Sequence, residues 1–159
     1  MTTQINEIIS NIINNIIRAY QFIQDIGISI PAEKLRNILK EVEHIAIHEL
    51  AHEIIRSIYP ETRDYYKSNP ILGECIDEVG ARMLELYISK RIGTYTHTFD
   101  EHVYEPKHYT NLQEISIDAR DLEEMYREIE KQIEEKKLKE AIGSVIKRCI
   151  EWVPKKRNS

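Results

Sequence analysis

The stretch HELAH at residues 48–52 places two histidines four positions apart in an apolar, helix-forming run. Apolar residues recur at three- and four-residue steps from about Pro31 to Pro60, and this period predicts one long helix. Residues four apart on a helix share a face, so both imidazoles can reach one metal ion. The apolar neighbours of the motif predict a helix buried on several sides; they are Ile45, Ala46, Ile47, Leu50, Ala51 and Ile54.

Apolar residues at helical spacing also occur over most of the remaining chain. Isoleucines at three- and four-residue steps predict an N-terminal helix over residues 1–27. A surface loop is predicted at 60–70 and a further helix at about 71–92, so residues 31–92 form a pair of helices that includes the HELAH motif. In residues 112–153 apolar residues recur at helical spacing both before and after a charged stretch at 134–137. This pattern predicts either two helices or one kinked helix.

Length and composition predict one domain over residues 1–159. Hydrophobic residues make up 42% of the chain and charged residues 31%, which is typical of a globular protein that can bury a core. The segment 93–111 is the least regular, and its threonine, tyrosine and histidine residues could form a short hairpin. We therefore expect a mainly α fold of four to five helices, with at most a small β-hairpin.

Charge and apolar patterning restrict the partners. The net charge of −5 predicts no general attraction to nucleic acid, and no apolar stretch approaches the roughly 20 residues that span a membrane. Cys75 and Cys149 are too few and too far apart for a disulfide framework, and with the absence of a basic leader they indicate a reducing, cytoplasmic setting. The apolar stripes of the C-terminal helices permit a homo-oligomer.

The HELAH residues point to zinc chemistry. Glu49 directly follows the first histidine, and in this pattern it can take a proton from a zinc-activated water and act as general base. His44 extends the histidine run, but three successive turns span about 12 Å at 1.5 Å per residue and cannot all reach one ion. We therefore expect His48 and His52 to bind zinc and His44 to be a neighbour.

A third ligand must come from another part of the chain, because a catalytic zinc has three protein ligands and one open position. The helix at 71–92 would return antiparallel to the HELAH helix and carries four carboxylates: Glu74, Asp77, Glu78 and Glu85. Glu74 and Glu78 share a face, so one could bind zinc while the other accepts the ring N–H of a ligand histidine. The alternative for any single carboxylate is a salt bridge with Arg56 or Arg82.

HELAH followed by Glu74-Cys75-Ile76-Asp77-Glu78 resembles the gluzincin metallopeptidases, and the likeness covers about 42–86. The ExxxE pattern is similar to the peptidase domain of anthrax lethal factor, and the short spacing is similar to minimal archaeal gluzincins. The resemblance implies that Glu74 is the third ligand of one Zn²⁺ and that Glu78 supports it from behind; Glu78 as the ligand is the alternative. Gluzincins also carry a β-sheet before the active-site helix, whereas the spacing of apolar residues before HELAH in this chain predicts helices.

The resemblance implies a zinc-dependent peptidase that acts on a peptide or protein substrate. In this family a tyrosine or histidine near the zinc stabilises the oxyanion, and Tyr66 and His97 are our candidates for that role. The histidine-rich segment could instead cover the zinc and keep the enzyme latent. Two other interpretations are a non-catalytic helical zinc-binding domain that regulates or binds a partner, and a helical bundle without metal.

Overall fold

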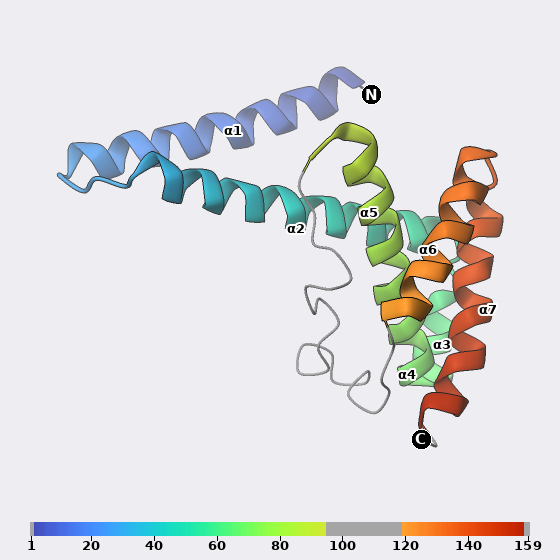
Figure 1. Ribbon diagram of the computed structural model, residues 1–159. Coiled ribbons are helices and arrows are strands. Elements are labelled where there is room, and N and C mark those ends of the chain that lie inside the picture. Colours follow the sequence, from blue (N-terminus) through green and yellow to red (C-terminus); the bar gives the residue numbers. More distant parts are fainter. Residues whose placement is uncertain (1, 95–118, 158–159) are drawn as a thin grey trace. The chain divides into compact units, whose positions relative to one another are not determined.

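A computed structural model describes residues 2–94 and 119–157, and every element in these ranges is a helix (Figure 1). This confirms the mainly α class. The predicted hairpin falls almost wholly on residues outside the described ranges. No helix among the described residues is both long enough and apolar enough to cross a membrane. The helices are α1 (Thr2–Asp25), α2 (Ala32–Ile58), α3 (Thr62–Ser68), α4 (Pro70–Glu74), the π-helix η1 (Cys75–Val79), α5 (Gly80–Ile92), α6 (Ala119–Glu134) and α7 (Leu138–Arg157).

The chain divides into two compact units, Met1–Leu39 and Lys40–Ser159, and the division falls inside α2. The first unit contains α1, as predicted for the N-terminal helix, and Gly27 adopts a positive φ of 87° just beyond its end. The isoleucine stripe of α1 is about half exposed. The second unit contains the HELAH motif and all the helices from α3 onward, and the single domain over residues 1–159 stays a prediction.

The α2 helix runs from Ala32 to Ile58, close to the predicted bounds, and the described part of the chain buries one of its faces. Ile47, Ala51 and Ile55 lie on that face at four-residue steps. Ile45 and Leu50 are 56% and 62% exposed, so the prediction of burial on several sides is wrong. The physical reason is that the packed helices of the second unit cover only the 47–51–55 face.

The region between Pro60 and Pro70 is helical, so the predicted surface loop is wrong. The two prolines flank α3 instead of interrupting it, and Asn69 caps the next helix by accepting a hydrogen bond from the Leu72 backbone. A Cβ atom at Gly73 would lie 2.7 Å from the Cα of Tyr66, so α3 and α4 approach too closely for a larger residue. The short α3 therefore depends on contact with α4.

The predicted helix at 71–92 is confirmed as an unbroken succession of α4, η1 and α5, which ends at Gly93 with a φ of 76°. Gly80 allows close packing against α2, because a Cβ there would lie 2.7 Å from Cδ1 of Ile55. The α5 helix thus begins directly against the buried face of α2.

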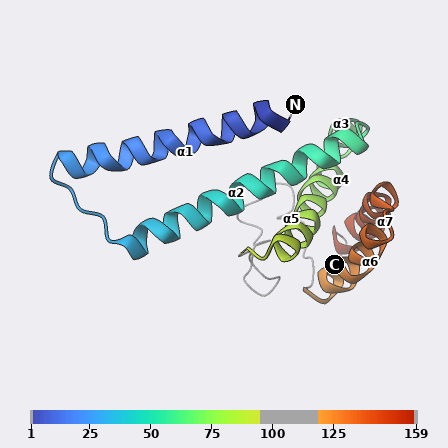
Figure 2. The ribbon, with the colours of Figure 1, turned by 90° about the horizontal axis from the view of Figure 1, so that it is seen from above.

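The C-terminal segment forms two helices, α6 and α7, and not the single kinked helix that the sequence also allowed. They are joined at Lys136, whose φ of 61° allows the chain to reverse, and they pack side by side (Figures 1 and 2). Their apolar faces, including Met125, Ile129 and Val145, complete the core together with α2, η1 and α5.

Cys75 of η1 and Cys149 of α7 form a disulfide that closes a sequence separation of 74 residues. The sequence did not indicate this single bond, which forms because α7 packs directly against η1. The reducing, cytoplasmic setting stays a prediction.

We expect reduction of the Cys75–Cys149 bond to lower the free energy of unfolding by about 4 kcal/mol, because the unfolded chain regains the entropy of a long closed loop. Urea unfolding with and without reductant measures the change. The Cys75→Ser, Cys149→Ser double variant is the control and should be insensitive to reductant. Two free thiols titrated in denatured, unreduced protein would contradict the cross-link.

Candidate metal centre

The centre is formed between α2 and the facing η1–α5 segment. The contacts run in opposite order along the two segments, since His52 pairs with Asp77 near the start of one and His48 pairs with Glu85 further along it. The two segments therefore run in opposite directions where they meet, which is the direction that the sequence predicted. Each is a continuous helical rod, so the side chains that meet are positioned by backbone hydrogen bonds and not by loops.

Three donor atoms converge on one point. The Nε2 atoms of His48 and His52 are 3.1 Å apart, and Oε2 of Glu78 lies 3.4 Å from the first and 3.5 Å from the second. Ligand atoms about 2.0–2.2 Å from a tetrahedral zinc are roughly 3.3–3.5 Å from one another. The donor set of two imidazoles and one carboxylate, with this spacing, fits a single zinc ion.

The opposite edge of each imidazole is held by a carboxylate. Nδ1 of His52 lies 2.8 Å from Oδ1 of Asp77, and Nδ1 of His48 lies 3.1 Å from Oε2 of Glu85. When Nδ1 of a neutral ring carries the proton and donates a hydrogen bond to the carboxylate, Nε2 presents a lone pair to the shared point. The carboxylates thus orient both rings so that each Nε2 faces the shared point, where loss of its proton would let it bind a metal.

Two adjacent residues of the π-helical turn, Asp77 and Glu78, both reach the histidines of α2. In a regular α-helix of 3.6 residues per turn, neighbouring side chains point about 100° apart. The i→i+5 hydrogen bonds of η1 place more residues in one turn, which narrows that angle. π-Helical turns within α-helices occur frequently at functional sites, and this one carries the carboxylates of the site.

Glu85 is the most deeply buried carboxylate of the site, with a side chain only 1% exposed. It contacts His48, His44 and the fully buried Arg82, whose Nη1 lies 3.2 Å from Oε2 of Glu85. A buried carboxylate requires such partners, because water cannot solvate it. His44 therefore has the neighbouring role predicted for it, through Glu85.

The electrostatic field of the site favours positive charge. Burial by itself would lower the pKa of His48 and His52, but hydrogen bonds to their carboxylate partners outweigh it and raise each pKa to about 9. Burial would raise the pKa of Glu78, yet its hydrogen bonds to the two histidines lower it to about 2. Protons supply the positive charge among these groups when no metal does, and a bound cation would replace them.

The structure brings Glu78, and not Glu74, to the histidines. Among the described residues, the group of converging donors consists of His48, His52 and Glu78, whereas Glu74 ends α4 one turn earlier. The helical register explains the difference, since the pairing of His52 with Asp77 places the next residue, Glu78, at the shared point. The geometry therefore favours the alternative that the sequence left open.

The other predicted residues lie around the centre. Glu49 is exposed on α2, next to His48 in the sequence. The Tyr66 hydroxyl donates to Oδ2 of Asp77 at 3.2 Å, and burial together with that carboxylate raises its pKa, so the proton is held there. Its oxyanion role stays a prediction, and His97 lies outside the described residues.

Asp77 and Glu85 were recognised in the sequence only as carboxylates of the second helix, without a role. The seven-residue spacing of Glu78 and Glu85 could have indicated a shared face, because two helical turns separate them. The role of Asp77 could not have been predicted from such a spacing, since it depends on the register of η1 against α2.

Comparisons with protein-family models, with curated proteins and with solved structures found no match for this chain. The function of this chain is therefore inferred from the geometry of the site and from the HELAH motif.

We expect the metal-free site to stabilise the fold most between about pH 4.5 and 6.5. The histidine pKa values are raised from 6.5 to about 9, so their contribution is complete below pH 6.5 and is lost as the pH rises to about 9. The pKa of Glu78 is lowered from 4.5 to about 2, so its contribution is lost as the pH falls through that range.

Urea unfolding in the presence of a chelator measures this effect. The difference in stability between the wild-type protein and the His48→Gln, His52→Gln double variant should be largest near about pH 5.5 and shrink by about pH 9. A difference that does not change with pH would contradict the assignment.

Proposed function

We propose that this chain binds one zinc ion through His48, His52 and Glu78. The observation that carries the proposal is the convergence of two Nε2 atoms and one carboxylate oxygen within 3.1–3.5 Å of one another. The carboxylates behind the histidines support it, because hydrogen-bonded imidazoles are the common form of histidine ligands. The buried carboxylates at the two Nδ1 atoms also bring negative charge close to the shared point, which favours a cation there.

We propose further that the site hydrolyses peptide bonds. Three protein ligands would leave the fourth position of the zinc open to water or substrate. The zinc would then polarise a water molecule and a substrate carbonyl. Glu49 is the general base: its carboxylate accepts a proton from the attacking water and delivers it to the leaving amine. The exposure of Glu49 supports this role, since a substrate must be able to reach it from solvent.

The resemblance to gluzincins supports the reaction class through HELAH and the glutamate on a second helix. In our proposal the ligand is Glu78, so the third ligand lies four residues later than the first alignment of the motif implied. Asp77, immediately before it, takes the supporting position at His52 that the resemblance assigned to a second glutamate.

A second candidate is a non-catalytic helical zinc-binding domain. It is favoured by the absence of any strand among residues 2–94 and 119–157, because gluzincins hold their peptide substrate along a sheet edge. In that case zinc would join α2 to the η1–α5 segment, and Glu49 would have no chemical role.

We expect Glu78→Gln to weaken zinc binding by at least about 100-fold, because it removes the charged ligand from the shared point. Glu74→Gln is the matched control, a glutamate one turn away that should leave the affinity within about threefold. Competition with a zinc-chelating dye measures both, and circular dichroism verifies the fold. A larger loss in Glu74→Gln than in Glu78→Gln would restore the first assignment.

We expect Glu49→Gln to lower the hydrolysis of a fluorogenic unfolded protein by about 10²–10⁴-fold while zinc affinity stays unchanged, since it removes a base but no ligand. The neighbouring Glu53→Gln, also exposed on α2, is the control and should retain activity. Zinc binding without hydrolysis in the wild-type protein would favour the non-catalytic candidate.

A further inference from the structure

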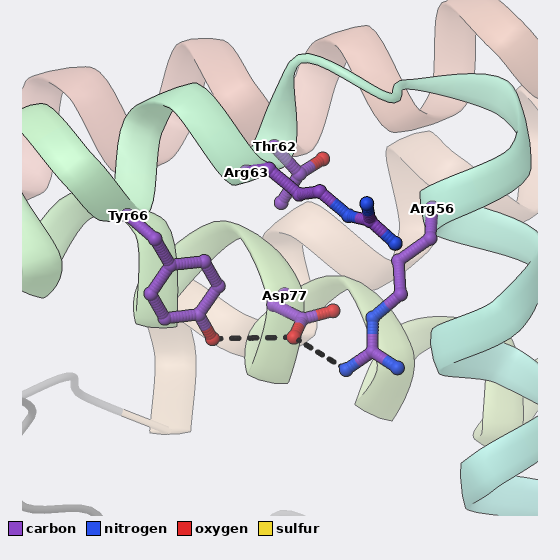
Figure 3. A pocket seen from close by; sticks show the side chains of 5 residues that line it. All are labelled: Arg56, Thr62, Arg63, Tyr66 and Asp77. Carbon is purple, nitrogen blue, oxygen red and sulfur yellow. Dashed lines mark hydrogen bonds and ion pairs between the residues drawn. The ribbon is translucent and has the colours of Figure 1, made fainter.

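A cavity of about 300 Å³ lies between the end of α2, the start of α3 and η1, and two arginines line it (Figure 3). The lining residues are Arg56, Thr62, Arg63, Tyr66 and Asp77. The volume is at the lower end of the range for small-molecule pockets. The proposed function assigns no role to this cavity or to either arginine.

The side chains that line the cavity include two guanidinium groups and one carboxylate, so the lining itself has an excess of positive charge. The carboxylate, Asp77, is only 4% exposed and is already engaged by His52, Arg56 and Tyr66. Arg56 donates to it through Nη2 but is still 45% exposed, which leaves other N–H groups of its fork open to a ligand.

Arg63 supplies the second cation. It is exposed, and none of the ion pairs within the described part of the chain involves it. In Figure 3 its side chain extends toward that of Arg56. Two guanidinium groups on one cavity match the oxygens of a carboxylate or of a tetrahedral oxyanion, because arginine binds both through paired, charge-assisted hydrogen bonds.

The cavity and the metal centre lie on opposite edges of the His52 ring. Nε2 of His52 faces Glu78, whereas Nδ1 faces Oδ1 of Asp77, and Oδ2 of Asp77 faces Arg56. A ligand in the cavity is therefore not a ligand of the metal. Asp77 is the group that both sites share.

We propose that this cavity binds an oxyanion between Arg56 and Arg63 and that its occupation strengthens metal binding through Asp77. Two effects have the same sign. The anion adds negative charge near a dication, and it competes with Asp77 for Arg56, which leaves more of the Asp77 charge for the N–H of His52. The coupling is reciprocal, so bound metal strengthens oxyanion binding by the same factor. The coupling rests on the proposed zinc site, whereas the oxyanion site does not.

Calorimetric titration of chelator-treated protein with sulfate and with acetate, at constant ionic strength set with chloride, tests the oxyanion site. We expect saturable binding of at least one probe. Tighter binding of sulfate would indicate a site for a tetrahedral oxyanion, and tighter binding of acetate a site for a carboxylate. Arg63→Gln should weaken it by about tenfold or more, whereas Arg127→Gln, an exposed arginine of α6, should not change it. No saturable binding of either probe, or equal binding by the Arg63→Gln variant, would overturn the proposal.

Zinc affinity measured with and without the saturating probe tests the coupling. We expect zinc to bind about fivefold more tightly or better with the probe present, and to show no such change in Arg63→Gln. An unchanged or weaker affinity refutes the coupling. A protein that binds no zinc at all refutes the proposed function and the coupling together, while the titration of metal-free protein still decides the oxyanion site.

Discussion

Buried carboxylates opposite a histidine face determine how the second unit is assembled. Asp77 and Glu85 have side chains 4% and 1% exposed, and water cannot solvate them there. Each needs N–H donors within hydrogen-bond distance, and the Nδ1 atoms of His52 and His48 provide them. The register of α2 against the η1–α5 segment is therefore restricted to the position in which both pairs form.

Apolar packing and a covalent bond bring these polar groups to that distance. Gly80 lets α5 start against Ile55 of α2, and η1 packs with its other side against α7. The Cys75–Cys149 bond lies in this second contact, at the first residue of the π-helical turn. The turn that presents Asp77 and Glu78 is thus held on one side by the core and on the other by the histidines.

This arrangement gives the site an electrostatic preference that suits a dication. Three carboxylates, Asp77, Glu78 and Glu85, surround two imidazoles, and the raised histidine pKa values express the same preference for positive charge. Arg56 and Arg82 balance part of this charge from the outer side. The candidate metal centre and the arginine-lined cavity share Asp77, whose two carboxylate oxygens contact His52 and Arg56.

Local sequence patterns determined the helices and half of the site. The period of apolar residues placed α1, α2 and the helix that follows Pro70, and the spacing of His48 and His52 put both imidazoles on one face, because such features repeat within one or two turns. Glu49 was identified by its position beside the first histidine.

Tertiary structure decided the rest. The choice of Glu78 over Glu74, the partnership of Asp77 with His52 and the Cys75–Cys149 bond depend on the register between helices far apart in the sequence. The one-sided burial of α2 and the short α3 depend on which neighbours cover them. The spacing of residues along one helix determines which of them share a face. Which of them come into contact with residues of another helix is determined only when the two helices pack.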